Sequence, residues 1–235
     1  MEVWVPAFAG TTALFVEAMA EPAVRPAIDV QVQLRTYFPT PVAVATLSES
    51  AALNAELERT ILERARAHPG VQHSNRGGWQ SSWDFNEWGG APARIIFDAA
   101  RALADKLTAD RAGQPARVTW RMNAWANVNR TGNGNEFHTH PGAFWAASYY
   151  VDDGGIDADP ALGGEFEIQD PRGVAPAMYA PTLAFGMPGG QSAGASELIR
   201  PKSGMLLMFP AWLSHGVRPY KGAGVRISVA LNLFL

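Results

Sequence analysis

The chain contains no cysteine among its 235 residues. Disulfide bonds, thiolate metal ligands and cysteine nucleophiles are therefore excluded, so any metal must be held by histidine, carboxylate or water. Charged residues are scarce at 17%, and the net charge is −3. Because a slightly acidic chain presents no basic field, we expect neither nucleic acid nor an acidic membrane as a partner. No apolar run is long enough to span a bilayer.

Hydrophobic residues, in contrast, make up 47% of the chain, which is enough for a full core. The length suits one large β domain. We expect residues 1–28 to be an N-terminal extension outside the core and residues 29–235 to form the single domain. The positively charged start of a secretory signal peptide is missing, and we expect a cytoplasmic protein.

Hydrophobic periodicity divides the chain into a helical part and a strand-forming part. Leu53, Leu57 and Ile61 recur at three-to-four spacing and predict a helix over 48–67. Pro92 begins a second helix, which Gly113 closes. Beyond residue 116 the period changes to two, with strands expected at 118–126, 143–151, 164–170, 183–186, 205–209 and 225–235. This pattern predicts a mainly β fold, a sandwich or barrel with two helices packed outside an antiparallel core.

Three of the five histidines lie in two short motifs, His138-Thr139-His140 and the segment around His215. Imidazole suits iron, zinc, copper or nickel. Residues i and i+2 of a strand point to the same side, so His138 and His140 can face one cavity. A distant antiparallel strand would supply His215 as the third ligand.

The expected carboxylate is absent from this set, because the usual non-haem iron site combines two histidines with one carboxylate. Three interpretations remain open. In the first, all three histidines hold the metal, and in the second, His138 and His215 hold it with His140 beside it. In the third, His140 starts a His-x-Gly pair with Gly142, and water completes the site. We predict that all three histidines lie near the metal.

Arg226 and Ser228 follow His215 and suggest a binding site for a carboxylate. A guanidinium forms a bidentate pair with a carboxylate, and a nearby hydroxyl adds a hydrogen bond. The two residues are two apart and so share one face of a strand. We expect the turn over 218–224 to bring this strand back alongside the strand of His215. An oxo acid would then bind the metal at one end and Arg226 at the other.

Several tryptophans admit two interpretations. Trp79, Trp83 and Trp88 lie in a glycine-bearing loop over 70–90. They either form an aromatic wall over the metal or fasten the loop to the helices. Of the remaining tryptophans, we expect Trp125, Trp145 and Trp212 in the core.

Together these motifs resemble the 2-oxoglutarate/Fe(II)-dependent oxygenases, in particular a bacterial branch similar to prolyl-hydroxylase-like members. The resemblance covers about residues 38–235. It is carried by Phe38-Pro39-Thr40-Pro41-Val42, Gly77-Gly78-Trp79-Gln80-Ser81, Asn123-x-Trp125-x-Asn127-Val128-Asn129, His138-x-His140-Pro141, Ser148-Tyr149-Tyr150-Val151, Gly204-x-Leu206-Leu207-x-Phe209-Pro210-Ala211-Trp212-Leu213-x-His215-x-Val217 and Arg226-Ile227-Ser228-Val229-x-Leu231-Asn232.

The resemblance implies a double-stranded β-helix, a jelly roll of the cupin kind, with iron(II) and 2-oxoglutarate. By motif position, His138 and His215 match metal ligands, and Arg226 with Ser228 matches the clamp on the distal carboxylate. Asn127, Asn129 and Tyr150 match strands that supply further 2-oxoglutarate contacts. His140 departs from the usual acidic ligand.

The implied reaction is hydroxylation of an unidentified small molecule or peptide, with conversion of 2-oxoglutarate and O2 to succinate and CO2. One alternative is a cupin-like three-histidine metalloenzyme. Such an enzyme does not bind 2-oxoglutarate, so its activity would not require Arg226. Another is a non-catalytic protein that binds a metal or small ligand.

Overall fold

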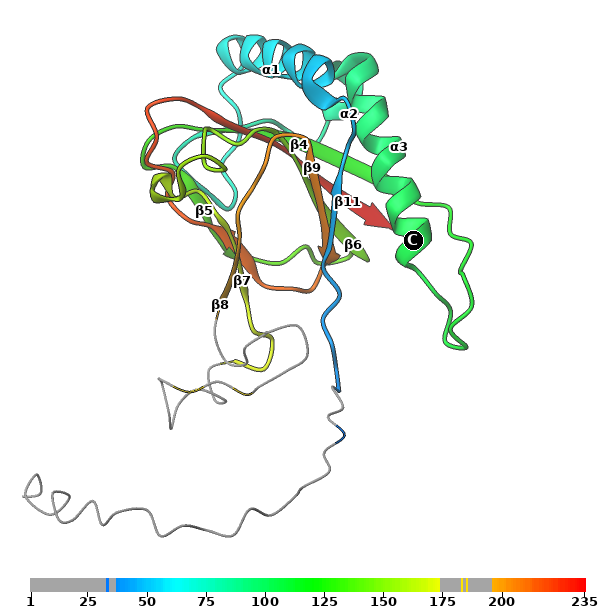
Figure 1. Cartoon of the computed structure of the whole chain (residues 1–235). Helices are drawn as coiled ribbons and strands as arrows, with labels where there is room; N and C mark the ends of the chain where they lie inside the picture. Colours follow the sequence, from blue (N-terminus) through cyan, green and yellow to red (C-terminus); the bar gives the residue numbers. More distant parts are fainter. Residues whose placement is uncertain (1–32, 34–36, 174–182, 184, 186–195) are drawn as a thin grey trace, which may run out of the picture. The chain divides into compact units, whose positions relative to one another are not determined.

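The computed structural model describes residues 33, 37–173, 183, 185 and 196–235 (Figure 1). The chain divides into two units, and the helices and strands described below belong to the second, Thr36–Leu235. The N-terminal extension predicted over 1–28, and positions 184 and 186 of the strand predicted at 183–186, lie outside the described residues. Among the described helices, none is long and apolar enough to cross a membrane.

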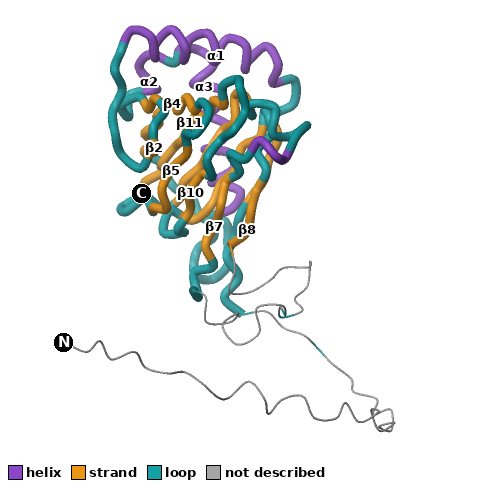
Figure 2. The backbone as a smooth tube through the Cα atoms, turned by 90° about the vertical axis from the view of Figure 1, so that its left-hand side faces the viewer, coloured by secondary structure: helices purple, strands orange, loops and turns teal. Residues whose placement is uncertain are grey.

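Two antiparallel sheets make up the β core. The described strands of the larger sheet run in the order β1 (Ala43–Thr46), β9 (Met205–Pro210), β6 (Trp145–Asp152), β11 (Arg226–Phe234), β4 (Arg121–Asn129) and β3 (Trp79–Gln80). Those of the smaller sheet run in the order β2 (Asn75–Arg76), β5 (Gly134–His138), β10 (His215–Val217), β7 (Phe166–Gln169) and β8 (Ser196–Ile199). In Figure 2 the smaller sheet is turned toward the viewer. Two antiparallel sheets in this order form a jelly roll, so the predicted fold is confirmed.

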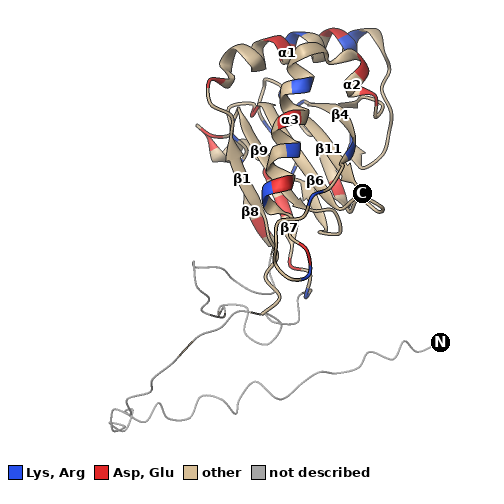
Figure 3. Ribbon diagram, turned by 90° about the vertical axis from the view of Figure 1, so that its right-hand side faces the viewer, with Lys and Arg blue, Asp and Glu red and all other residues tan. Residues whose placement is uncertain are grey.

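Two long helices cover the outer face of the larger sheet: α1 (Ser50–Ala67) and α3 (Gly90–Leu107), with the short α2 (Phe85–Trp88) before α3. Both predicted long helices are confirmed. α3 ends earlier than the predicted Gly113, because Asp110 accepts hydrogen bonds from the backbone of Ala112 and Gln114 and forms a turn. Charged residues lie along α1 and α3 in Figure 3.

Strand alternation separates two cores. On β11, Ile227, Val229, Leu231 and Leu233 belong to the apolar cluster shared with the helices. The intervening residues point to the opposite face, between the sheets. A second cluster, which includes Phe166, Leu207 and Phe209, fills part of this interior. One face of the sheet therefore packs the helices, while the other is available for polar groups.

The connection after β10 corrects one prediction. β10 pairs with β5 and β7 in the smaller sheet, whereas β11 pairs with β4 and β6 in the larger one. The turn after β10 therefore does not bring the next strand back alongside, as expected, but carries it to the other sheet. His215 and Arg226 consequently come from opposite sheets, which local sequence spacing does not reveal.

Leu231 provides a test of this layer arrangement. Its side chain is fully buried against the helices on a strand paired along both edges. Leu231→Ala should lower the free energy of unfolding by about 2–5 kcal/mol, because it leaves a cavity. Leu235→Ala, at a side chain 67% exposed, should change it by less than about 0.5 kcal/mol. Urea denaturation measures both, and equal effects would contradict the arrangement.

Candidate functional site

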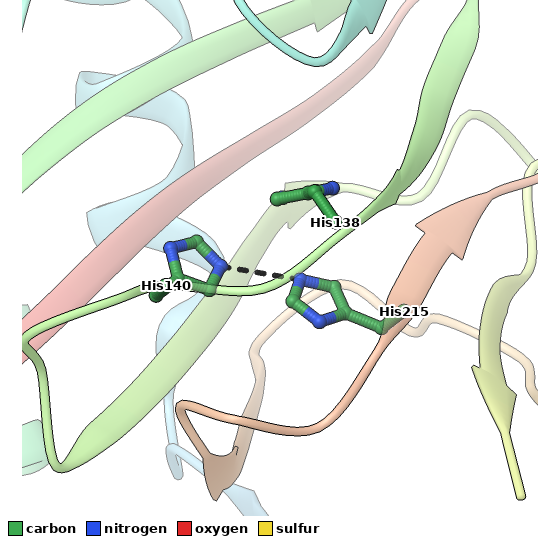
Figure 4. Close-up of side chains that lie close together, drawn as sticks. All are labelled: His138, His140 and His215. Carbon is green, nitrogen blue, oxygen red and sulfur yellow. Dashed lines mark hydrogen bonds between the residues drawn. The ribbon is translucent and has the colours of Figure 1, made fainter. Parts of the chain in front are cut away.

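The structure brings the three histidines of the two motifs together (Figure 4). His138 ends β5 and His215 begins β10, and the two are paired in register across the smaller sheet. His140 lies beyond the end of β5, so the expectation that it shares a strand with His138 is wrong. Its backbone N–H donates to the carbonyl of Ala211 at 2.8 Å. This contact holds the loop so that His140 still faces the other two rings.

The spacing of the imidazole nitrogens fits a metal ion. One ring nitrogen from each histidine lies within 4.8 Å of the others, and Nε2 of His140 is 3.2 Å from Nε2 of His215. Two imidazole nitrogens bound to a metal at about 2.1 Å lie roughly 3.0 Å apart at a right angle and about 3.4 Å apart in a tetrahedron. The donor set also suits a borderline metal such as iron.

Backbone carbonyls orient two of the rings. Nδ1 of His138 donates to the carbonyl of Glu136 at 2.7 Å, and Nδ1 of His215 donates to that of Leu213 at 2.8 Å. Because a carbonyl only accepts, each Nδ1 carries the proton, and each Nε2 presents its lone pair. Such a second hydrogen bond fixes the tautomer and orientation of metal-binding histidines.

Burial keeps the three rings neutral. It lowers the pKa of His215 to about 3 and that of His140 to about 4, and it lowers the pKa of His138 as well. The positive charge of neighbouring histidines acts in the same direction. At neutral pH the site therefore offers unprotonated nitrogens, the form that binds metals.

The predicted carboxylate clamp lies on the inner face of the larger sheet. Arg226 is opposite Asn129 in register, and Ser228 is opposite both Asn127 and Tyr150. All five side chains are buried. The structure thus places every predicted 2-oxoglutarate contact on three neighbouring strands, β6, β11 and β4.

Arg226 is the most deeply buried cation in the described part of the chain, at 1% exposure. It forms no ion pair with any described residue, and its Nε has no hydrogen-bond partner. Its guanidinium lies 5.2 Å from the centre of the Tyr150 ring. Burial lowers the pKa of Arg226, but a guanidinium remains protonated in proteins.

A glycine makes room for this arginine. Gly164 has a φ of +77°, and a side chain there would place its Cβ 3.3 Å from Cδ of Arg226 and 2.7 Å from Cδ1 of Ile156. Such a residue would push the guanidinium out of place, and the positive φ would strain it further.

Gln80 is a candidate that sequence reasoning missed. It lies on β3 opposite Asn127 in register and is 2% exposed. Its Oε1, Oδ1 of Asn127 and the hydroxyl of Tyr150 are all buried and lack hydrogen-bond partners among the described residues. The signal was present in the motif Gly77-Gly78-Trp79-Gln80-Ser81, but the sequence does not show that the short β3 pairs with β4.

The tryptophans divide between the two interpretations. Trp79 Nε1 donates to the carbonyl of His68, and Trp88 Nε1 donates to Asp84, so both fasten the loop. Trp83 is 43% exposed, and its ring contacts that of His73 edge-on. Trp125 and Trp145 are buried as predicted, whereas the core placement of Trp212 is wrong, because this residue is 57% exposed.

Comparisons with known proteins bear on the family and the fold of the chain. Residues 123–232, from β4 to β11, match a protein family described as putative 2OG-Fe(II) oxygenase. No curated protein matches the chain. Among solved structures, a prolyl hydroxylase from Trichoplax adhaerens, in complex with a hypoxia inducible factor peptide fragment, is similar with a TM-score of 0.58 and 14% identity, over 82% of this chain and 83% of that one.

Two further structures share the fold. A prolyl-4-hydroxylase from Pseudomonas putida has a TM-score of 0.56 and 12% identity, over 83% of this chain and 92% of that one. The α-ketoglutarate-dependent epimerase SnoN from nogalamycin biosynthesis has a TM-score of 0.56 and 14% identity, over 83% and 76%. The prediction of a 2-oxoglutarate/Fe(II)-dependent oxygenase is confirmed, and its assignment to a bacterial branch stays a prediction.

The metal-ligand set is tested by single substitutions. His138→Ala and His215→Ala should abolish iron(II) binding, because each removes an oriented ligand. His140→Ala should weaken binding by roughly 10–100-fold, whereas His140→Asp should retain it. Anaerobic titration with iron(II) measures the affinity, with His73→Ala, a histidine outside the cluster, as the control. Equal affinity in all His140 variants would leave a two-histidine site.

Acid should destabilise the metal-free protein. The folded pKa values of His140 and His215, about 4 and about 3, lie below the ordinary 6.5 of the unfolded chain. Below pH 6.5 the unfolded chain therefore takes up protons that the folded chain does not. The free energy of unfolding should fall as the pH is lowered, to about pH 4 for the contribution of His140 and to about pH 3 for that of His215. The slope should be on the order of 1 kcal/mol per pH unit for each group. Urea denaturation between pH 7.5 and 5 should show a shallower slope for His140→Gln, and an identical slope would contradict this.

Proposed function

We propose that this chain, an oxygenase by the family match over residues 123–232, holds iron(II) with His138, His140 and His215. We further propose that it holds 2-oxoglutarate with Arg226 and Ser228, assisted by Asn127, Asn129 and Tyr150, and thereby hydroxylates a small molecule or a peptide. Residues 29–235 would form this domain, with 1–28 as an extension. The expected cytoplasmic location stays a prediction.

The single observation that carries the proposal is the buried guanidinium of Arg226, which forms no ion pair with any described residue and whose Nε lacks a hydrogen-bond partner. Burying a charge without a partner costs several kcal/mol. The cost is offset when a carboxylate enters and forms the bidentate pair that a guanidinium prefers. An anion is therefore the ligand that this interior lacks, and the nearby histidines make a metal-chelating diacid the best fit.

The metal site supports the same ligand by its charge. Three neutral imidazoles leave the full charge of iron(II) uncompensated, about one unit more positive than a site with a carboxylate. A diacid brings two negative charges, one end for the metal and the other for Arg226. Bound together, iron and 2-oxoglutarate supply the oxidation of a C–H bond by O2, with succinate and CO2 as co-products.

Other residues of the chain would bind the diacid and keep water away from the metal. The Ser228 hydroxyl and the Asn127 amide lie beside Arg226 and can bond the distal carboxylate of the diacid. The rings of Phe209 and Phe166 lie 4.5 Å and 5.0 Å from that of His215. These apolar rings exclude water from one side of the metal centre, which strengthens every electrostatic contact there.

The cupin-like alternative is less consistent with the structure, because an enzyme without an acidic cosubstrate would keep a buried cation that forms no ion pair within the described part of the chain. The substrate itself is proposed only as a class. One similar structure is a prolyl hydroxylase with a peptide fragment, and another is an epimerase of nogalamycin biosynthesis. Both a peptide and a small molecule therefore remain within the proposal.

The carboxylate clamp is tested with Arg226→Ala. Removing the charged partner from a buried pair costs roughly 2–5 kcal/mol, so the dissociation constant for 2-oxoglutarate should rise by about 30-fold or more while the metal stays bound. Calorimetric titration of the zinc-loaded protein measures this affinity, and succinate release measures turnover. Arg218→Ala, an exposed arginine paired with Glu167, is the control and should bind normally. An unchanged affinity for Arg226→Ala would favour the cupin-like enzyme.

A further inference from the structure

The buried polar atoms that lack a hydrogen-bond partner fall into two groups in the described part of the chain. Gln80, Asn127, Tyr150 and Arg226 supply four of them, all beside the proposed cosubstrate. The other two are Oδ1 of Asn123 and Oδ1 of Asn232. These two residues are opposite each other in register on β4 and β11. The second group is therefore a distinct pair of acceptors on the same inner face.

The register places the metal centre between the two groups. Along β11 and β4 the opposed pairs are Arg226 with Asn129, Ser228 with Asn127, Ala230 with Trp125, and finally Asn232 with Asn123. The ring of Trp125 lies 5.7 Å from that of His140. His140 is thus at the level of the Trp125–Ala230 pair. Along the strands, this level lies between Arg226 and the two asparagines.

The diacid cannot reach both groups. Asn232 lies six positions after Arg226 on β11, which at about 3.3 Å per residue is roughly 20 Å along the strand. A five-carbon diacid that spans Arg226 and the metal ends well before the asparagines. Their oxygens are therefore left for another molecule.

Small side chains flank the pair. Asn232 is 9% exposed and is opposite Ala146 on β6, a residue with the smallest side chain after glycine. Ala230, the neighbour of Asn232 on the same face, is only half-buried although its strand is central in the sheet. Ala146 is itself buried in the second apolar cluster, so the half-buried Ala230 is the place where this face is open between the metal centre and the two acceptors.

We propose that Asn123 and Asn232 are the substrate-recognition pair and that the substrate is a neutral molecule with amide N–H or hydroxyl donors next to the oxidised carbon. This inference rests on the proposed function. Two side-chain amide oxygens accept hydrogen bonds without adding charge. A cationic donor is disfavoured, because the metal and Arg226 already make this interior positive.

Stability gives a first test that needs no substrate. A buried acceptor that is kept for a ligand weakens the fold, so replacing it with a side chain of similar size should stabilise the metal-free protein. Asn232→Leu and Asn123→Leu should each raise Tm by about 2–4 °C. Asn54→Leu is the matched control and should lower Tm, because Asn54 Oδ1 accepts from the Tyr149 hydroxyl at 2.6 Å. A Tm that stays or falls for the Asn232 and Asn123 variants would assign these amides to the fold and overturn the proposal.

Binding of paired probes gives the second test. N-acetylprolinamide is compared with its N,N-dimethylamide, and methyl glucoside with its fully O-methylated form, by calorimetric titration of the zinc-loaded protein with 2-oxoglutarate bound. The donor-bearing member of at least one pair should bind at least tenfold more tightly than its methylated partner, and Asn232→Leu should remove this difference. Preference for the methylated members, binding by none, or an unchanged preference in Asn232→Leu would overturn the proposal.

Failure of this inference is distinguishable from failure of the proposed function. Asn232→Leu should keep the wild-type affinity for 2-oxoglutarate within about twofold, because its side chain lies beyond the reach of the diacid. If wild-type protein bound no 2-oxoglutarate, the proposed function would fail, while the Tm comparison would still report on the two asparagines.

Discussion

The two-residue alternation of β11 is the constraint on which the rest of the structure depends. This strand is paired along both edges, with β6 on one side and β4 on the other. Its apolar residues, such as Leu231, pack the helices, while Arg226 and Ser228 point between the sheets. A shift of one residue would exchange the two faces and bury the guanidinium against the helices. The fold and the candidate site therefore require the same register.

Much of this arrangement is readable from local patterns. The period of two over residues 225–235 predicts β11 and places Arg226 with Ser228 on one face. The three-to-four spacing of Leu53, Leu57 and Ile61 predicts α1. The clustering of the three histidines was predictable as well, because the His138-x-His140 motif lies where β5 ends and the apolar segment before His215 leads to the start of β10.

What could not be predicted depends on pairing between distant segments. Nothing near Gly216 shows that β10 and β11 belong to different sheets, because that choice is made by β5 and β7 on one side and β4 and β6 on the other. The burial of Gln80 follows from its pairing with Asn127, and it was missed for the same reason. Trp212 was misplaced because hydrophobicity alone does not distinguish a core tryptophan from an exposed one.

The crossing from β10 to β11 has a consequence for the lifetime of the protein. His138 and His215 lie in the smaller sheet, whereas Arg226 lies in the larger one. A metal and a diacid bound together to these residues would therefore connect the two sheets. A ligand that binds only the folded chain stabilises it by RT ln(1 + [L]/Kd), about 2.7 kcal/mol at a hundredfold excess over Kd. Chains without bound iron and diacid would then unfold more often and be degraded sooner by proteases. The abundance of the protein would therefore follow the supply of iron and of the diacid.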